Sequence, residues 1–266
     1  MYGAIIGDIV GSRFEFDNIK TKDFEFFDAR CHFTDDTVMT CAIMAALLTE
    51  RNVPDTRLYD AAIYWMQKLG RKYIGAGYGR NFYKWIKSDN PQPYESYGNG
   101  AAMRVSPCAW VADNYLDAEH NAYLVTIPTH NHKEAILGAK TISTMIYLAR
   151  DPDSFTDMAS LRYYAEKTYS LDFTLDEIRP TYKFNETCQG SVPQAIECFL
   201  ESTSFEDCIR NAISIGGDSD TIAAIAGSIA EAYYGIPDWM IKEARAKLDP
   251  YLCQIIDKFD KQFIIT

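Results

Sequence analysis

Hydrophobic residues recur along this chain at the spacing of α-helices. Between positions 58 and 69 they follow one another at steps of three and one, which places them on one face of a helix. The same spacing recurs over residues 135–149 and 205–213. Further helices are predicted over residues 38–50, 80–87, 154–169, 192–201, 221–234, 237–248 and 251–263.

No segment of useful length alternates hydrophobic and polar residues as a half-buried strand does. The chain has 266 residues and contains no Ser/Gly/Pro-rich linker, low-complexity tract or clear repeat. We therefore predict a single all-α domain over residues 1–266, with about ten or more helices. Long loop-like stretches cover residues 14–33, 89–100 and 174–190, and ordered loops of this length often carry a functional site.

The charge balance narrows the class of partner. Lys and Arg total 26 against 37 Asp and Glu, so the formal net charge is −11. Phosphate contacts need clustered Lys and Arg, and this balance therefore argues against a broad nucleic-acid surface or an anionic-membrane surface.

Cysteine usage and apolar runs indicate the compartment. The seven cysteines are scattered, with no Cys-x-x-Cys pair, unlike a secreted disulfide framework. We find no basic leader of the signal-peptide type. The most apolar helix candidate, residues 222–230, is about half the length that a bilayer span needs. We expect a cytoplasmic protein that does not cross a membrane.

Two acidic clusters each precede an apolar helical run. They are Phe33-Thr34-Asp35-Asp36-Thr37 and Gly216-Gly217-Asp218-Ser219-Asp220-Thr221. Ser, Thr and Asp are favoured N-caps, and acids in the first turn complement the helix dipole. Capping is therefore a sufficient explanation for either cluster alone.

Together, the two clusters carry more oxygen ligands than capping requires. Carboxylates that converge repel one another, and their pKa values rise unless a cation neutralises them. Oxygen ligands without nearby Cys or His select Mg²⁺, Mn²⁺ or Ca²⁺ over zinc. Two such clusters could hold two ions about 3.5–4 Å apart, as hydrolytic sites often do. Gly216 and Gly217 would permit close backbone approach or positive φ.

Two further segments contain candidate chemistry. Residues 95–104 read Glu-Ser-Tyr-Gly-Asn-Gly-Ala-Ala-Met-Arg, and small residues let consecutive backbone N–H groups face one anion, although Tyr-Gly-Asn-Gly is also ordinary turn chemistry. Residues 3–11 are rich in Gly and Ala and could form a tightly packed helix. Asp8 within this segment would either support a metal ligand or serve as a buried cap or salt-bridge partner.

The motifs occur in a specific order: residues 7–12, 33–37 and 96–104, then Thr129-His130, then residues 217–221. This series resembles the ADP-ribosylglycohydrolase family over nearly the whole chain. The resemblance implies a compact orthogonal all-α domain with a binuclear Mg²⁺ (or Mn²⁺) centre at helix N-termini. It also implies hydrolysis of the glycosidic bond between ADP-ribose and an acceptor, so that the expected partner is ADP-ribose or an ADP-ribosylated substrate.

The resemblance assigns roles by matched position. The metal ligands it implies are Thr34, Asp35, Asp36, Asp218, Asp220 and Thr221. Glu15 matches a mobile-loop glutamate of the family's serine-specific branch and is a candidate to position or activate water, with Asp35 or Asp36 as the other candidates to handle the proton. The substrate-binding residues it implies are Ser96, Tyr97, Gly98, Asn99, Gly100 and His130.

The acceptor and two other function classes stay open. Residues 96–104 and 191–193 are closest to the serine-specific branch, yet protein Ser or Arg, nucleic acid, poly(ADP-ribose) and O-acetyl-ADP-ribose are all possible acceptors. The alternatives to an ADP-ribosyl hydrolase are an inactive ADP-ribose-binding protein and a metal-dependent hydrolase of another nucleoside-like ligand. The intact set of six oxygen ligands favours an enzyme.

Overall fold

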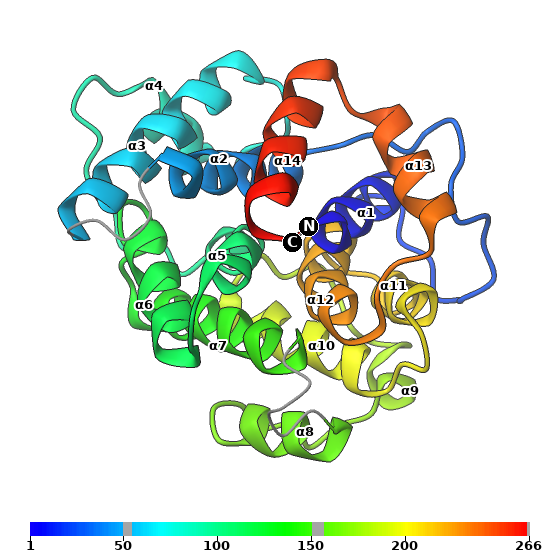
Figure 1. Ribbon diagram of the computed structural model, residues 1–266. Coiled ribbons are helices and arrows are strands. Elements are labelled where there is room, and N and C mark those ends of the chain that lie inside the picture. Colours follow the sequence, from blue (N-terminus) through cyan, green and yellow to red (C-terminus); the bar gives the residue numbers. More distant parts are fainter. Residues whose placement is uncertain (50–54, 151–156, 265–266) are drawn as a thin grey trace.

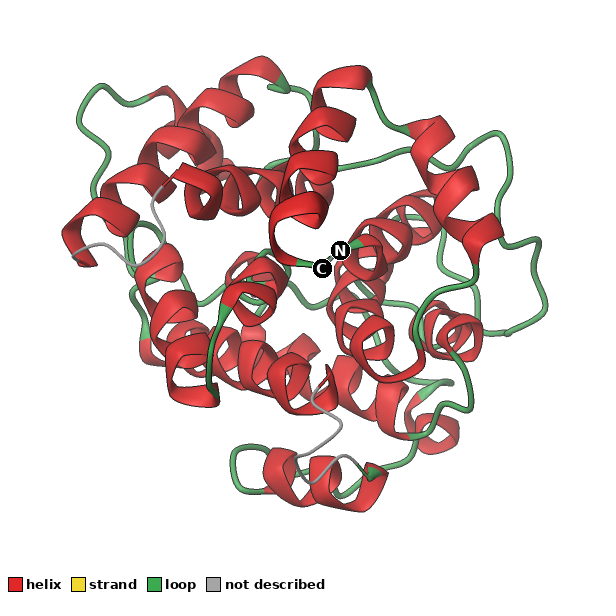
Figure 2. Ribbon diagram, viewed as in Figure 1, coloured by secondary structure: helices red, strands yellow, loops and turns green. Residues whose placement is uncertain are grey.

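The computed structural model describes residues 1–49, 55–150 and 157–264, and every regular element in these ranges is a helix (Figure 2). The α-helices are α1 (Tyr2–Gly11), α2 (Asp35–Thr49), α3 (Asp55–Lys72), α4 (Arg80–Lys87), α5 (Ser106–Val111), α6 (Tyr115–Thr126), α7 (Lys133–Arg150), α8 (Met158–Glu166), α9 (Leu175–Ile178), α10 (Cys188–Leu200), α11 (Phe205–Ser214), α12 (Ser219–Tyr234), α13 (Asp238–Lys247) and α14 (Pro250–Phe263). Two 3₁₀ helices, η1 (Ser12–Phe14) and η2 (Asn99–Ala101), complete the set. The all-α prediction is confirmed.

Helices α1 and α12 lie side by side at the centre of the molecule (Figure 1). All ten residues of α1 are buried. A Cβ atom on Gly3 would lie 2.2 Å from the carbonyl oxygen of Gly227, and one on Gly7 would lie 2.1 Å from that of Ala223. The two helices are therefore antiparallel with their backbones in direct contact, which only glycine permits at these positions. The tight packing expected of residues 3–11 is confirmed.

The other helices enclose this pair (Figure 1). Helices α7, α10 and α11 pack against α12, and α2 packs against α1, α3 and α14. The buried hydrophobic side chains form one cluster that extends from α1 to α14. Across the described ranges, no helix combines the length and the apolar character that crossing a membrane demands.

Several boundaries differ from the sequence prediction. Helices α5 and α6 were not predicted, since α5 has only six residues and α6 buries few large side chains. Helix α9 lies inside the predicted loop 174–190. Helix α10 begins at Cys188 rather than at residue 192, because the side chain of Thr187 accepts a hydrogen bond from the Gly190 N–H and caps the helix there. Residues 50 and 154–156, which two predicted helices included, lie outside the described ranges.

Candidate active site

Asp8 of α1 caps the helix that begins at the first acidic cluster. Its carboxylate accepts hydrogen bonds from the Thr34 N–H at 2.9 Å, the Thr34 hydroxyl at 2.6 Å and the Thr37 N–H at 3.0 Å. The Thr37 hydroxyl also donates to it. Because an acid from another helix satisfies the start of α2, capping does not explain Asp35 and Asp36.

The second acidic cluster is used only in part at its helix start, where Asp220 Oδ1 accepts a hydrogen bond of 3.0 Å from the Thr221 N–H. Asp218 occupies the N-cap position of α12 but makes no side-chain capping bond. Its Oδ2 instead accepts a hydrogen bond of 2.6 Å from Asn99 Nδ2. The preceding Gly216 and Gly217 have φ values of +69° and +81°, as the sequence suggested. Asn18 binds the Gly217 N–H at 2.7 Å and its carbonyl at 2.9 Å, which fastens the loop of residues 14–33 to this turn.

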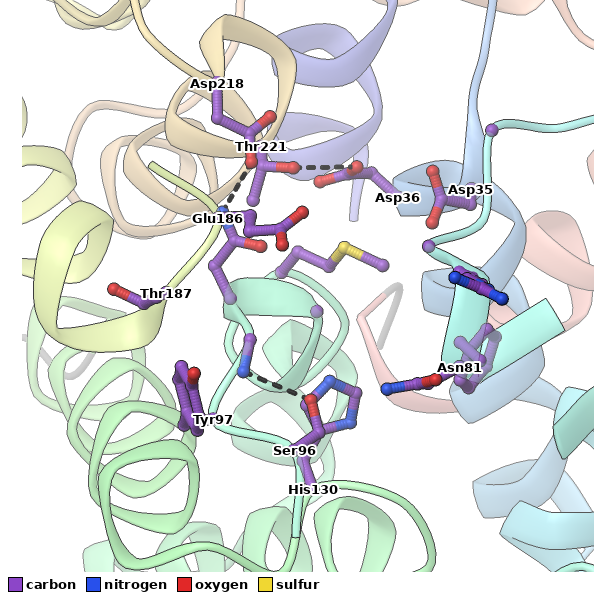
Figure 3. Close-up of a pocket in the computed structure, with 18 of the residues that line it drawn as sticks. Asp35, Asp36, Asn81, Ser96, Tyr97, His130, Glu186, Thr187, Asp218 and Thr221 are labelled. Carbon is purple, nitrogen blue, oxygen red and sulfur yellow. Dashed lines mark hydrogen bonds between the residues drawn. The ribbon is translucent and has the colours of Figure 1, made fainter. Parts of the chain in front are cut away.

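The two clusters converge, together with Glu15. Carboxylate oxygens lie within 4.8 Å of one another in two groups, Asp8 with Asp36 and Asp220, and Glu15 with Asp218 and Asp220. The Thr221 hydroxyl donates to Asp36 Oδ2 at 3.1 Å (Figure 3). The other oxygen, Asp36 Oδ1, is buried without a hydrogen-bond partner in the described part of the chain.

An unpartnered buried carboxylate oxygen among other acids is what a bound hard cation would satisfy. The donor set therefore fits Mg²⁺ or a similar ion. Asp35 belongs to neither group, and its side chain lines the cavity beside Gly77. The structure thus brings Asp36, Asp218 and Asp220 together more closely than it does Asp35.

Burial and mutual repulsion raise the pKa values of these acids. Burial, then Asp8 and Asp218, raise the pKa of Asp35 to about 8. Burial, then Asp218 and Asp8, raise that of Glu15 to about 7. The pKa values of Asp36 and Asp220 lie well above the ordinary range, first through burial and then through neighbouring carboxylates. The cluster cannot be fully ionised at neutral pH without a compensating positive charge.

The predicted substrate-binding loop is fixed by a second loop. The Asn99 N–H donates to the Glu186 carbonyl and the Cys188 N–H to the Tyr97 carbonyl, both at 2.8 Å. These bonds flank an isolated bridge between Gly98 and Thr187. The loop therefore holds a defined conformation beside the acidic cluster, to which Asn99 ties it directly.

One cavity of about 810 Å³ joins the acidic cluster to this loop, a volume typical of small-molecule sites. Figure 3 shows the acids at one end and Ser96, Tyr97 and His130 at the other. The predicted site residues that line it are Glu15, Asp35, Asp36, Ser96, Tyr97, Gly98, Asn99, Gly100, His130, Asp218, Asp220 and Thr221. Thr34 is not among the lining residues; its hydroxyl donates to Asp8 at 2.6 Å.

Sequence reasoning missed several residues of this cavity. Glu186 faces it from the loop before α10 (Figure 3), Arg104 lines it from within the core, and residues 77–84 form a further wall around the start of α4. Asn18 fixes the loop that carries Glu15. None of these positions has a local spacing signal, because each reaches the site only through a tertiary contact.

The fold and the cavity define a class: a helical protein with buried carboxylates at helix N-termini beside a Gly-Asn-Gly loop. A family model described as ADP-ribosylglycohydrolase matches residues 1–263. The chain belongs to this family, and is accordingly a hydrolase.

Individual relatives and a solved structure agree with this membership. ADP-ribosylhydrolase ARH3 of Homo sapiens is 27% identical over 305 residues, covering 88% of this chain and 84% of the relative. ADP-ribosylarginine hydrolase Tri1 of Pseudomonas putida (strain GB-1) is 24% identical, covering 92% and 73%. A solved structure titled "ADP-ribosylglycohydrolase-related protein complex" superposes with a TM-score of 0.70 at 20% identity, covering 98% and 95%. That likeness shows a shared fold.

Proposed function

We propose that this protein hydrolyses the glycosidic bond between ADP-ribose and an acceptor, with two Mg²⁺ or Mn²⁺ ions as cofactor. The observation that carries the proposal is the hydrogen bond from Asn99 to Asp218. It joins a loop suited to a diphosphate to a carboxylate cluster suited to metals, within one cavity. The relatives that match over most of the chain are ADP-ribosylhydrolases by name.

The proposed metal ligands are Thr34, Asp35, Asp36, Asp218, Asp220 and Thr221. The unpartnered Asp36 Oδ1 supports this set, as does the Thr34 hydroxyl, which donates its proton to Asp8 and so keeps lone pairs free. When bound, divalent ions would attract the oxygen atoms of the ribose hydroxyls and lower the pKa of a bound water.

Glu15 is the proposed proton-transfer group, with Asp35 or Asp36 as alternatives. Its carboxylate lies beside Asp218 and Asp220 and lines the cavity, where glycoside cleavage requires a group that gives or takes a proton. A carboxylate beside the anomeric carbon also stabilises the oxocarbenium-like transition state of glycoside cleavage. Backbone N–H groups of residues 96–100 and the His130 ring would hold the diphosphate and ribose.

An assay over several ADP-ribose conjugates identifies the acceptor from which ADP-ribose is released. A panel of Ser-, Arg- and nucleic-acid-linked ADP-ribose conjugates, poly(ADP-ribose) and O-acetyl-ADP-ribose is assayed for released ADP-ribose with Mg²⁺ or with EDTA. We expect Mg²⁺-dependent release from at least one conjugate. Asp218→Asn should fold and lose this release, and a fully active Asp218→Asn protein would contradict the proposal.

The inactive-binder alternative has a distinct outcome. Calorimetry with ADP-ribose, with and without Mg²⁺, would then show binding while every conjugate stays intact. Absence of ADP-ribose binding with and without Mg²⁺ would contradict both the hydrolase and the inactive-binder hypotheses. It would favour a hydrolase of another nucleoside-like ligand. The single-domain organisation and the cytoplasmic location stay predictions of the sequence.

A further inference from the structure

One ring nitrogen of His130 is bound to the protein, and the other faces the substrate loop. The side chain is 5% exposed at the wall of the cavity. Its Nδ1 lies 2.6 Å from Thr129 Oγ1. A Cβ atom on Gly98 would lie 3.5 Å from Nε2, and one on Gly100 would lie 3.3 Å from it. Nε2 therefore faces these two glycines, and no residue in the described ranges forms a hydrogen bond with it.

Thr129 is in turn bound by a buried cation. Arg104 is 1% exposed, and its Nη2 donates to Thr129 Oγ1 at 2.8 Å. The same nitrogen lies 3.3 Å from the Val125 carbonyl and 3.5 Å from the Thr126 carbonyl. Burial lowers the pKa of Arg104 to about 10, so the guanidinium stays charged at neutral pH.

These contacts decide where the protons lie. A guanidinium only donates, so Thr129 Oγ1 accepts from Arg104. The single proton of the Thr129 hydroxyl then goes either to His130 Nδ1 at 2.6 Å or to the Thr126 carbonyl at 3.5 Å. A contact of 2.6 Å between Oγ1 and Nδ1 must be a hydrogen bond, and a Thr129 hydroxyl that donates to Nδ1 forms it with good geometry. If Nδ1–H instead donated to Thr129 Oγ1, the hydroxyl proton could only be directed to the Thr126 carbonyl at 3.5 Å.

We propose that Arg104 and Thr129 are positioning residues that hold His130 as the neutral tautomer protonated on Nε2. In this state Nε2–H donates a hydrogen bond to a phosphate or hydroxyl oxygen of the ADP-ribose portion of the substrate. The identity of that acceptor rests on the proposed function, whereas the tautomer does not. Gly98 and Gly100 keep the space over Nε2 open.

The charge state agrees with this arrangement. Burial, and then the nearby Arg104, lower the pKa of His130 well below its ordinary value. The ring is therefore neutral at physiological pH and carries a single N–H proton, on either Nδ1 or Nε2. A neutral ring with Nδ1 occupied as an acceptor presents a donor to the cavity, which suits the oxygen-rich diphosphate and ribose.

The tautomer is measured directly by ¹⁵N NMR of the histidine rings in the free protein. The chain has only four histidines, so His130→Asn assigns the signal. We expect a protonated Nε2 and an unprotonated Nδ1 in the wild type. Thr129→Val removes the hydroxyl and should move the proton wholly or partly to Nδ1, while Thr129→Ser should retain the wild-type state.

Thr126→Val is the matched control. Thr126 is as buried as Thr129, and its hydroxyl has no partner in the described residues, so its loss should leave the His130 signal unchanged. For ADP-ribose we expect Kd to rise about tenfold in Thr129→Val and to stay at the wild-type value in Thr126→Val and Thr129→Ser.

The outcomes separate the two proposals. A wild-type ring protonated on Nδ1, or a Thr129→Val protein with the wild-type tautomer and Kd, would overturn the positioning role and leave the hydrolase function standing. A wild type that does not bind ADP-ribose would refute the proposed function, while its NMR spectrum still decides the tautomer. Because the wild-type spectrum suffices for that decision, a variant that fails to fold does not prevent it.

Discussion

At the scale of single residues, hydrogen bonds divide the acids of the site into two kinds. Asp8 accepts four hydrogen bonds from Thr34 and Thr37, so its lone pairs are largely used in holding α2. Asp36 keeps one oxygen without a partner in the described chain. Glu15 accepts a hydrogen bond from Asn18 through its backbone carbonyl, which leaves its carboxylate available. Asp36 and Glu15 line the cavity, whereas Asp8 is not among its lining residues.

Glu15→Gln tests the proposed proton-transfer group. The amide has nearly the same shape but cannot take a proton, so we expect kcat to fall by about 10²–10⁴-fold while Kd for ADP-ribose changes little. Steady-state kinetics and calorimetry measure the two quantities. Asp17→Asn, which removes one negative charge at an exposed position two residues away, is the matched control. A Glu15→Gln enzyme with more than a tenth of wild-type kcat would exclude this role.

The raised pKa values make stability depend on pH and on divalent cations. In the folded state the pKa of Asp35 is about 8 and that of Glu15 about 7, against ordinary values of 3.8 and 4.5. A carboxyl with a raised folded-state pKa stabilises the fold at low pH, and that contribution is lost as pH rises through the folded-state pKa. In EDTA, Tm should therefore fall between about pH 5 and pH 8.

Mg²⁺ should raise Tm more at pH 8 than at pH 5, because it offsets the repulsion between ionised carboxylates and competes with fewer protons. Thermal unfolding in EDTA and in Mg²⁺ at both pH values measures this, with NaCl of equal ionic strength as the control. A Tm in EDTA that rises towards pH 8, with no specific effect of Mg²⁺, would refute the metal assignment.

At the scale of elements, the site is formed where α1, α2 and α12 meet. The sequence predicted both acidic helix starts, because those motifs are contiguous and precede strong apolar runs. Glu15, His130 and residues 96–100 were assigned by the family resemblance, and they line the same cavity as the acids. Sequence reasoning missed α5 and α6, whose periodicity is short or weak. It offered a buried cap as one role for Asp8, which is the role the structure shows. It could not assign Asn18 or Arg104, because their partners are far away in the sequence, as Gly217 is from Asn18.

Gly7→Ala tests whether backbone contact between α1 and α12 supports the site. The added Cβ would lie 2.1 Å from the Ala223 carbonyl oxygen and would push the helices apart. We expect destabilisation of about 3 kcal/mol, at the upper end for overpacking, or a Tm lower by about 6–12 °C. Gly75→Ala is the control, since its Cβ would meet nothing within 4 Å. A Gly7→Ala protein as stable as Gly75→Ala would contradict the packing argument.

At the scale of the whole molecule, the charge of −11 has two parts. Four of the acids, Asp35, Asp36, Asp218 and Asp220, are proposed metal ligands, and two bound divalent ions would bring the formal charge to −7. The remaining negative charge creates a potential that repels the two phosphate groups of ADP-ribose at long range. Arg80 and Lys84 line the cavity and act against this potential only locally.

Salt should therefore speed the arrival of the ligand. The Debye length shortens from about 30 Å at 0.01 M to about 8 Å at 0.15 M ionic strength, which screens the distant acids more than the contacts inside the cavity. With Mg²⁺ present, we expect the association rate constant of a fluorescent etheno-adenine analogue of ADP-ribose to rise a few-fold over this range in stopped-flow experiments. Etheno-adenosine, which is uncharged, should show little change. A rate that falls with salt would instead mean that the positive charges at the cavity, which are Arg80, Lys84, Arg104 and the proposed Mg²⁺ ions, attract the diphosphate more strongly than the remaining acids repel it.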